Sequence, residues 1–368
     1  MTLAPHVASA RILLPCRDLP ALLAFLTETV GLQLERIFPA EEPAVADLRG
    51  FGLALRLSTQ EPARGTPPVL HLVCDRAALP TGTPDVLHGP EGWQVRLLDA
   101  SARIEVPEGR QSLVISRLPP TASSSRYDGP AWTLGRAGMR YRDLLPDRFG
   151  GRFVASHIAI VEGGAVPDYV HYHHVRFQMI YCLAGWVRLV YEDQGEPFVL
   201  HAGDCVLQPP TIRHRVLEAS AGLEVLEIGC PAIHETCVDH DLPLPNGAAH
   251  PGRQYGGQHF VRHVAALSTA LWRPAEATVG TDACDLGITA ATSGLARVHA
   301  VRAPAGYRAR ARHGGEFRLL YLREGSLSLQ HSTLGQHALT AGDCVTMPAD
   351  EEFALHSDDG FLAVEVSL

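Results

Sequence analysis

The sequence contains no lysine, because all 31 of its basic residues are arginine. Schiff-base chemistry, attachment of pyridoxal phosphate and P-loop phosphate transfer each require a lysine, so these three classes of chemistry are excluded. The sequence also lacks an apolar run that approaches the roughly 20 residues needed to cross a bilayer. Its N-terminus has no basic segment followed by an apolar stretch, so no secretory signal is predicted and a cytoplasmic protein is expected.

Paired cysteines and excess positive charge are also missing. The eight cysteines include no CxxC pair, which favours reduced, mostly buried thiols over a disulfide framework or a zinc ribbon. The formal net charge is −9 and no basic stripe offsets it, so a nucleic-acid partner is not expected. The expected partner is a small-molecule substrate, with neither nucleic acid nor a membrane.

What the sequence does contain is an internal repeat. Residues 177–185 and 317–325 share the pattern FxxxY followed by glycine, and AGDCV then recurs at 202–206 and 341–345. The glycines lie eighteen positions apart in one copy (185 to 203) and seventeen in the other (325 to 342), which indicates a duplication. Both copies alternate short apolar runs with Gly, Asp and Pro turns, a pattern typical of antiparallel jelly rolls.

The first hundred residues follow a different pattern, with a helix between strands. A strand at 11–15 precedes helical spacing over 19–30 that ends at Gly31, and strands are predicted at 33–38, 46–48, 53–57, 69–73 and 93–98. The predicted organisation is a first domain over 1–117, a linker over 118–130, a first barrel over 131–245, a connector over 246–270 and a second barrel over 271–368.

Three histidines and a glutamine have the spacing of a metal site. His171 and His173 are two residues apart, so on a strand both point to one face. Gln178 follows His173 by five residues, and His214 ends the stretch 203–214, which continues from the AGDCV segment of the first copy. Three neutral imidazoles and an oxygen donor suit a divalent first-row metal with positions left open for substrate or dioxygen.

These residues resemble the two motifs of the cupin superfamily, G(X)5HXH(X)3-4E(X)6G and G(X)5PXG(X)2H(X)3N. His171, His173, Gly185, Gly203, Pro209 and His214 match, and one extra residue follows Gly164. Gln178 stands at the glutamate position, Thr211 at a glycine and Glu218 at the asparagine. The resemblance implies a bicupin, hence a mainly β fold of two tandem cupin jelly-roll barrels after an α+β domain of βαβββ type. It also implies a metal held by His171, His173, His214 and Gln178.

Gln178 leaves two interpretations open. A site of three histidines and a glutamine keeps the full +2 charge of the metal, which favours anionic or chelating substrates. The alternative is that Gln178 only hydrogen-bonds beside the metal while water fills its position. In the second copy, His313 stands at the His173 position, while Ala311, Arg318 and Phe353 replace the other donors. His356 lies three residues too late to substitute, so one metal per chain is expected.

The N-terminal region resembles the vicinal-oxygen-chelate (glyoxalase/bleomycin-resistance) family, through residues 11–19, the helix that ends at Gly31, and Gly89-Pro-Glu-Gly-Trp93. Arg11 and Arg96 stand where that family often has metal ligands, and His71 is at a familiar ligand position. Because two arginines repel a cation, the prediction is a scaffold or substrate-gating domain without a metal.

Catalytic groups are less clearly marked. Glu218 is the best acid or base if it faces inward, Tyr181 follows Gln178 on the same predicted strand, and Arg213 beside His214 can clamp a carboxylate. Surface ion pairing is the alternative for Arg213. The run from His234 to His240 contains metal-binding residue types, but it follows the barrel strands and is interpreted as a loop.

The leading hypothesis is a non-haem iron(II) oxygenase that acts on a small anionic or chelating substrate. Zinc, manganese, nickel and copper are the alternative metals. The first alternative is a metal-dependent isomerase or lyase in which the metal polarises a carbonyl and Glu218 or a tyrosine moves a proton. The second is a metal-dependent small-molecule sensor or binding module. A homodimer is expected, because duplicated barrels of this kind often pair through their sheet faces.

Overall fold

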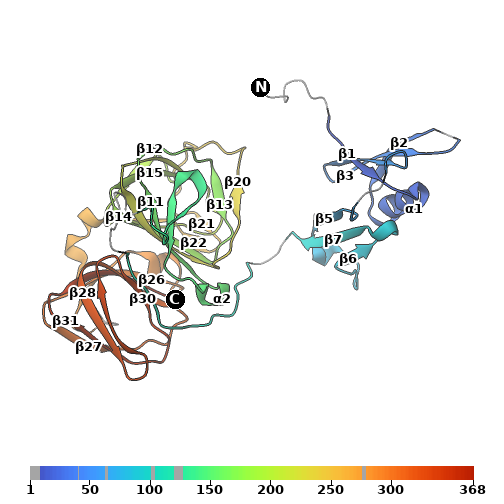
Figure 1. Ribbon diagram of the computed structural model, residues 1–368. Helices are drawn as coiled ribbons and strands as arrows, with labels where there is room; N and C mark the ends of the chain where they lie inside the picture. The colour runs from blue at the N-terminus through green and yellow to red at the C-terminus, as the bar shows by residue number, and fades with distance from the viewer. Residues whose placement is uncertain (1–8, 40, 63–64, 101–103, 120–126, 276–278) are drawn as a thin grey trace. The chain divides into compact units, whose positions relative to one another are not determined.

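The computed structural model describes residues 9–39, 41–62, 65–100, 104–119, 127–275 and 279–368. The chain is mainly β, as predicted, and divides into two compact units, residues 1–103 and 104–368 (Figure 1). Within the described segments, no helix is both long enough and apolar enough to span a membrane. All eight cysteines lie in described segments and are free thiols, six of them buried.

The first unit opens with the predicted strand–helix–strand pattern. The elements are β1 (Ile12–Pro15), α1 (Leu19–Ala24) with a π-helical continuation (Phe25–Thr29), β2 (Gln33–Phe38), β3 (Val45–Gly50) and β4 (Leu53–Ser58). Their order in the sheet is β1-β4-β3-β2, with β1 parallel to β4. Asp18 caps the helix by accepting a hydrogen bond from the amide of Ala21 at 3.0 Å, and Leu22 and Leu26 are fully buried.

A smaller sheet completes this unit. It contains β5 (Val69–Cys74), β6 (Val86–His88) and β7 (Gln94–Asp99), with β5 parallel to β7. Buried Trp93 and Val95 pack into the same core as the helix. Arg11 forms an ion pair with buried Asp47, and His71 and Arg96 are exposed neighbours on β5 and β7.

The second unit begins with a sandwich of two facing sheets, which carries the histidines. One sheet has the order β23-β17-β14-β19-β11-β10-β9, in which β23 is Val261–His263, and the other has the order β16-β15-β18-β13-β20. We call this the first sandwich. The strands and short helix are β9 (Thr133–Leu134), β10 (Arg140–Asp143), α2 (Arg148–Gly151), β11 (Val154–Ile160), β12 (Gly164–Ala165), β13 (His171–His173), β14 (Phe177–Ala184), β15 (Trp186–Tyr191), β16 (Phe198–His201), β17 (Cys205–Leu207), β18 (His214–Ala219), β19 (Leu223–Cys230) and β20 (Thr236–Val238).

The C-terminal part repeats this pairing and is called the second sandwich. Its elements are β24 (Arg273–Pro274), β25 (Asp282–Asp285), α3 (Ile288–Ala291), β26 (Arg297–Ala303), β27 (Tyr307–Ala311), β28 (Arg318–His331), β29 (Gly335–Thr340), β30 (Cys344–Thr346), β31 (Phe353–Ser357) and β32 (Phe361–Ser367). The pairing of His171 with His214 on β13 and β18 recurs as Ala311 with Phe353 on β27 and β31. The long strand β28 takes part in both facing sheets.

The two sandwiches exchange strands. β8 (Val114–Ser116), which precedes the first sandwich, pairs with β30 of the second, while β23 (Val261–His263), which precedes the second, pairs with β17 of the first. Each exchanged segment is held by the aspartate of an AGDCV motif. Asp343 accepts a hydrogen bond from the amide of Leu118 and Asp204 accepts one from Ala265, both at 2.8 Å.

This exchange explains where the first unit ends. The sequence-based boundary was 117, but residues 104–117 belong to the second unit because β8 completes a sheet of the second sandwich. The predicted linker over 118–130 includes residues 120–126, which lie outside the described residues. The predicted connector contributes β21 (Gln254–Tyr255), β22 (Gln258–His259) and β23, and Tyr255 is buried in the first sandwich.

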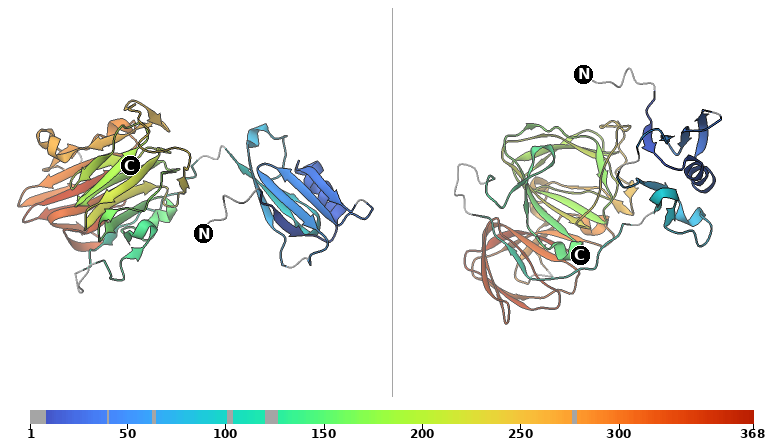
Figure 2. Two further views of the ribbon diagram at one scale, coloured as in Figure 1. Left: turned by 90° about the horizontal axis from the view of Figure 1, so that it is seen from above. Right: turned by 45° about the vertical axis from the view of Figure 1, so that its right-hand side comes forward.

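The two sandwiches share one hydrophobic core. It joins buried residues from both repeats, and the rings of Phe153 and Phe317 stack with centroids 4.3 Å apart. The views in Figure 2 show the orange-to-red strands of the second sandwich beside the green-to-yellow strands of the first. Residues 104–368 therefore form one compact unit whose shared interior leaves the opposite face of β14 free to line a separate cavity.

Candidate metal centre

Two adjacent strands bring the three predicted histidines together. His171 and His173 occupy alternate positions on β13, and His171 is paired with His214 on antiparallel β18. The exposed fractions of the three residues are 1%, 8% and 5%, respectively. Their ligand atoms all lie within 4.8 Å of one another, so the strand alternation assumed from the sequence produces the cluster.

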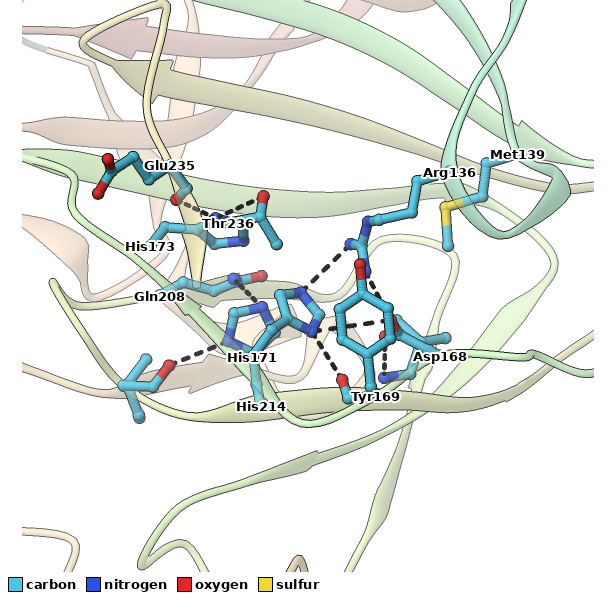
Figure 3. Close-up of polar contacts among 12 residues, drawn as sticks. Arg136, Met139, Asp168, Tyr169, His171, His173, Gln208, His214, Glu235 and Thr236 are labelled. Carbon is cyan, nitrogen blue, oxygen red and sulfur yellow. Dashed lines mark hydrogen bonds and ion pairs between the residues drawn. The ribbon is translucent and has the colours of Figure 1, made fainter. Parts of the chain in front are cut away.

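Each imidazole is oriented by a backbone carbonyl. Nδ1 of His171 donates to Tyr169 at 2.8 Å, Nδ1 of His173 to Glu235 at 3.2 Å, and Nδ1 of His214 to Ile212 at 3.0 Å (Figure 3). Because the carbonyls accept, the proton is assigned to Nδ1, and Nε2 carries the free lone pair. This arrangement is common for metal-binding histidines, whose second ring nitrogen is held by a hydrogen bond.

Burial keeps the three imidazoles neutral. Desolvation lowers the pKa of His171, lowers that of His173 to about 3 with a contribution from neighbouring His171, and lowers that of His214 well below its usual value. Neutral imidazole is the form that binds a metal. The donor set therefore fits a divalent transition metal.

Two further side chains donate hydrogen bonds to the Nε2 lone pairs of His171 and His214. A guanidinium nitrogen of Arg136 lies 3.2 Å from Nε2 of His171, and Nε2 of Gln208 lies 3.0 Å from Nε2 of His214. In both pairs the histidine nitrogen accepts the hydrogen bond. The nitrogens that would bind a metal are thus available as acceptors inside the cavity.

Gln178 lies on β14, at the wall of the same cavity. Its side-chain amide donates to Oε1 of Glu227 on β19 at 2.6 Å, and its oxygen is 3.5 Å from Nε2 of Gln208. The sequence analysis did not identify Glu227. The repeat contained a signal for Glu227. In the second copy, Arg318 matches Gln178 and Glu365 matches Glu227, and Arg318 and Glu365 form a buried ion pair at 2.7 Å.

Arg136 and Asp168 also belong to the site and were missed. Arg136 lies in the loop between β9 and β10 and lines the cavity. Asp168, whose side chain is fully buried, accepts from Arg136 at 2.5 Å and from the amide of Val216 at 3.0 Å. Neither residue falls within the repeat motifs, so no spacing rule pointed to them.

The cavity encloses about 100 Å³. Its polar groups are the three histidines, Arg136, Gln178, Gln208 and Glu227. The remaining lining is mostly apolar and consists of Met139, Tyr141, Ile158, Ile160, Ile180, Val187, Leu189, Val216, Leu223 and Val225. A small, largely apolar molecule with an anionic group fits this lining.

The three predicted catalytic residues lie elsewhere. Glu218 forms an ion pair with Arg188 at 3.4 Å and its side chain is 43% exposed. The register between β15 and β18 shifts next to Glu218, which ends the alternation that places His214 and Val216 at the cavity. Glu218 is therefore not among the residues that line the cavity.

Tyr181 and Arg213 face away for a simpler reason. Gln178 and Ile180 line the cavity, so alternation turns Tyr181 into the core shared by the sandwiches, where its hydroxyl accepts a hydrogen bond from Arg323 at 2.8 Å. Burial raises the pKa of Tyr181 to about 12. Arg213 precedes His214, and it forms an ion pair with Asp239 at 3.0 Å and covers the ring of Tyr172.

Comparison with known proteins agrees with this geometry. Residues 157–229, which carry His171, His173, Gln178 and His214, match the family model for the cupin domain. A search of curated proteins found no match.

Two structures of salicylate 1,2-dioxygenase from Pseudaminobacter salicylatoxidans are similar in fold. One has 16% identity and a TM-score of 0.53, and the match covers 71% of this chain and 86% of that chain. The other, an adduct with gentisate, has 17% identity and a TM-score of 0.52 over 71% of this chain and 82% of that chain. At this identity the likeness establishes the fold of the matched part.

The second sandwich has a different set of residues at the corresponding place. Ala311 faces Phe353, Arg318 is paired with Glu365, and Nε2 of His313 donates to the carbonyl of Met347 at 2.6 Å. His356 forms an ion pair with Asp358. Among the described residues of this sandwich, no three potential ligands come together as His171, His173 and His214 do.

One interpretation needs correction. The run from His234 to His240 is not only a loop, because residues 236–238 form β20, which pairs with β13 in antiparallel register. Tyr172 is opposite Cys237 and His173 is opposite Thr236. The run was judged by its place after the barrel strands, and the pairing with β13 could not be inferred from that position.

Proposed function

We propose that this protein is a metal-dependent cupin enzyme, with non-haem iron(II) oxygenase as the leading activity. The observation that carries the proposal is the set of three neutral imidazoles, each held at Nδ1 by a carbonyl and each presenting Nε2 to one cavity. A bound iron(II) would supply open positions at which a chelating substrate and dioxygen can react.

The protein groups around the centre support one class of substrate. Arg136 supplies a positive charge whose position is set by buried Asp168, so it can bind a carboxylate or enolate. Apolar side chains form most of the remaining wall. We therefore propose a small substrate with an apolar body and one anionic group. The gentisate adduct of the structurally similar dioxygenase has this chemistry.

Gln178 and Glu227 supply the polar wall on the opposite strands. Because the amide of Gln178 donates to Glu227, the oxygen of Gln178 remains as a donor atom for a metal or a substrate. Glu227 takes the place of Glu218 as the candidate proton acceptor, since it lines the cavity. This arrangement also serves the alternative activity, a metal-dependent isomerase or lyase.

The other parts of the proposal concern the whole chain. The second sandwich is proposed as a duplicated cupin fold without a metal, and the first unit as a scaffold of vicinal-oxygen-chelate type without one. A homodimer in the cytoplasm is proposed for the protein. The two assignments without a metal rest on the repeat pattern and on the replacement of ligands at Ala311, Phe353, Arg11 and Arg96.

Oxygen consumption tests the proposal. Protein stripped of metal and reloaded with iron(II) is supplied with gentisate or salicylate, and uptake is followed with an oxygen electrode. Substrate-dependent uptake is expected, and His171→Ala should abolish it while His201→Ala, which changes an exposed histidine of β16, should not. Equal anaerobic turnover with zinc, manganese or nickel would refute the oxygenase and favour the isomerase or lyase.

A further inference from the structure

A second group of metal-binding side chains lies on the outer side of β13 and β20. His174 directly follows β13, Glu235 directly precedes β20, and Cys237 is in the middle of β20. The antiparallel pairing of these strands sets them side by side, with Tyr172 opposite Cys237. His174 and Glu235 are exposed and Cys237 is half-buried, so an ion from solvent can reach them.

The three ligand atoms have separations suited to one tetrahedral ion. Nδ1 of His174 is 3.3 Å from Oε2 of Glu235, and Sγ of Cys237 is 4.0 Å and 3.9 Å from these two atoms. With zinc bonds of about 2.0–2.1 Å to nitrogen and oxygen and about 2.3 Å to sulfur, tetrahedral angles give separations of roughly 3.3–3.6 Å. Small side-chain movements, which an exposed position allows, would bring Sγ of Cys237 to this separation from the other two ligand atoms.

The charges also favour a divalent cation. Glu235 and a Cys237 thiolate together carry two negative charges, which balance a divalent ion held with neutral His174. The nearby positive charge of Arg213 is already paired with Asp239 at 3.0 Å. This donor set differs from that of the central cavity, where the three candidate ligands that lie together are all neutral imidazoles.

We propose that His174, Glu235 and Cys237 form a second metal site, selective for a thiophilic divalent ion such as zinc. The bonds formed are from the ion to Nδ1, to a carboxylate oxygen and to Sγ, with water as the fourth ligand. The thiol proton of Cys237 is released to solvent as the sulfur binds.

Glu235 links this outer site to the central one. Its carbonyl accepts from Nδ1 of His173, while its side chain points away from the three imidazoles (Figure 3). An ion bound outside ties β20 to the end of β13 and so fixes the carbonyl that orients His173. The outer metal is therefore a structural brace for a central ligand.

Cobalt(II) titration of the reduced full-length protein tests the site. Cobalt bound by a thiolate gives a sulfur-to-metal charge-transfer absorption, which histidine ligands do not give. We expect this absorption in the natural protein and in His171→Ala, loss of it in Cys237→Ser, and binding weakened about tenfold or more in His174→Ala. Cys74→Ser changes the other half-buried cysteine and should leave the absorption intact.

Two results would overturn the proposal. One is a natural protein without the charge-transfer absorption at saturating cobalt. The other is an absorption that persists in Cys237→Ser. Thermal unfolding of metal-free Cys237→Ser checks that the fold is unchanged, and Glu235→Gln provides a second variant that keeps the thiol and removes only the carboxylate.

Discussion

The side-chain amide of Gln178 donates a hydrogen bond to the carboxylate of Glu227 at 2.6 Å, across the neighbouring strands β14 and β19. The position that holds a glutamate in most cupin motifs is therefore neutral here, and a carboxylate is supplied by the adjacent strand instead. The carboxylate on this wall of the cavity therefore stands at a position that the motif does not mark.

Replacing Gln178 by glutamate should destabilise the metal-free protein at neutral pH. The change sets two carboxylates against each other, so one of them acquires a raised pKa. We expect Gln178→Glu to be about 1–3 kcal/mol less stable than the natural protein at pH 7.5, and this difference to close near pH 5, where a shared proton restores the hydrogen bond. Urea unfolding at both values measures this, with Gln336→Glu at an exposed position as the control. Equal stability of Gln178→Glu and the natural protein at pH 7.5 would contradict the role of this pair.

The metal content of variants distinguishes the central histidine site from the outer site and from the second sandwich. In the Cys237→Ser background we expect one equivalent of divalent metal per chain after purification without chelators, and none when His171→Ala is added. The reason is that Ala311 and Phe353 replace two histidines in the second sandwich. Elemental analysis gives the result. Two equivalents in Cys237→Ser would show that the second sandwich, or another group, also binds metal.

The metal-free protein should lose stability as the pH falls below about 6.5, the pKa of an unfolded histidine. Burial lowers the pKa of all three ligand histidines, that of His173 to about 3. Between these values the unfolded chain binds more protons than the folded one, so the free energy of unfolding decreases on acidification, by about 1.4 kcal/mol per pH unit for each histidine. Denaturant titrations at pH 7.5, 6.0 and 5.0 measure the slope. His173→Gln should flatten it and His201→Gln should not; an unchanged slope in His173→Gln would refute this account.

The sequence was sufficient for the parts of the site that depend on strand alternation and on the repeat. Residues two apart on β13 and the closing histidine of the second motif are local patterns, and they predicted the three histidines. The same alternation, applied from Gln178, would have turned Tyr181 away from the cavity. Glu218 could not be placed because a register shift in β18 has no signature in its residues.

The spacing of residues in the motifs could not predict site residues that lie outside the motifs. Arg136 lies in a short turn before β10, and only the folded sheets bring it to His171. Asp168 is close to His171 in the sequence but lies outside both motifs, so no motif position marked it. The exchange of β8 and β23 between the sandwiches is equally non-local. A short apolar strand gives no indication of which edge it pairs with, so the boundary at 117 followed composition rather than pairing.

Arg136 should determine affinity for the anionic group of a ligand. In Arg136→Leu, we expect gentisate binding to the metal-loaded protein to weaken about 10–100-fold, the loss of one charge-assisted hydrogen-bonded pair of about 1.5–3 kcal/mol. Hydroquinone, which has the same ring without the carboxylate, should be affected little. Isothermal titration gives both affinities, and Arg188→Leu on the outer face is the control. Equal losses for the two ligands would mean that Arg136 acts on the cavity in general and not on the carboxylate.

The strand exchange predicts where the chain can be shortened. A protein that starts at residue 104 should keep the second unit intact, because the boundary between the two compact units lies after residue 103 and β8 stays paired with β30. A protein that starts at residue 119 loses that strand together with the hydrogen bond from Leu118 to buried Asp343. It also exposes the edge of β30, an unpaired strand that favours association. Thermal unfolding and light scattering should therefore show a lower midpoint and aggregation only for the shorter protein. If both proteins unfold at the same temperature and remain monodisperse, the pairing of β8 contributes little and the boundary at 117 is the better description.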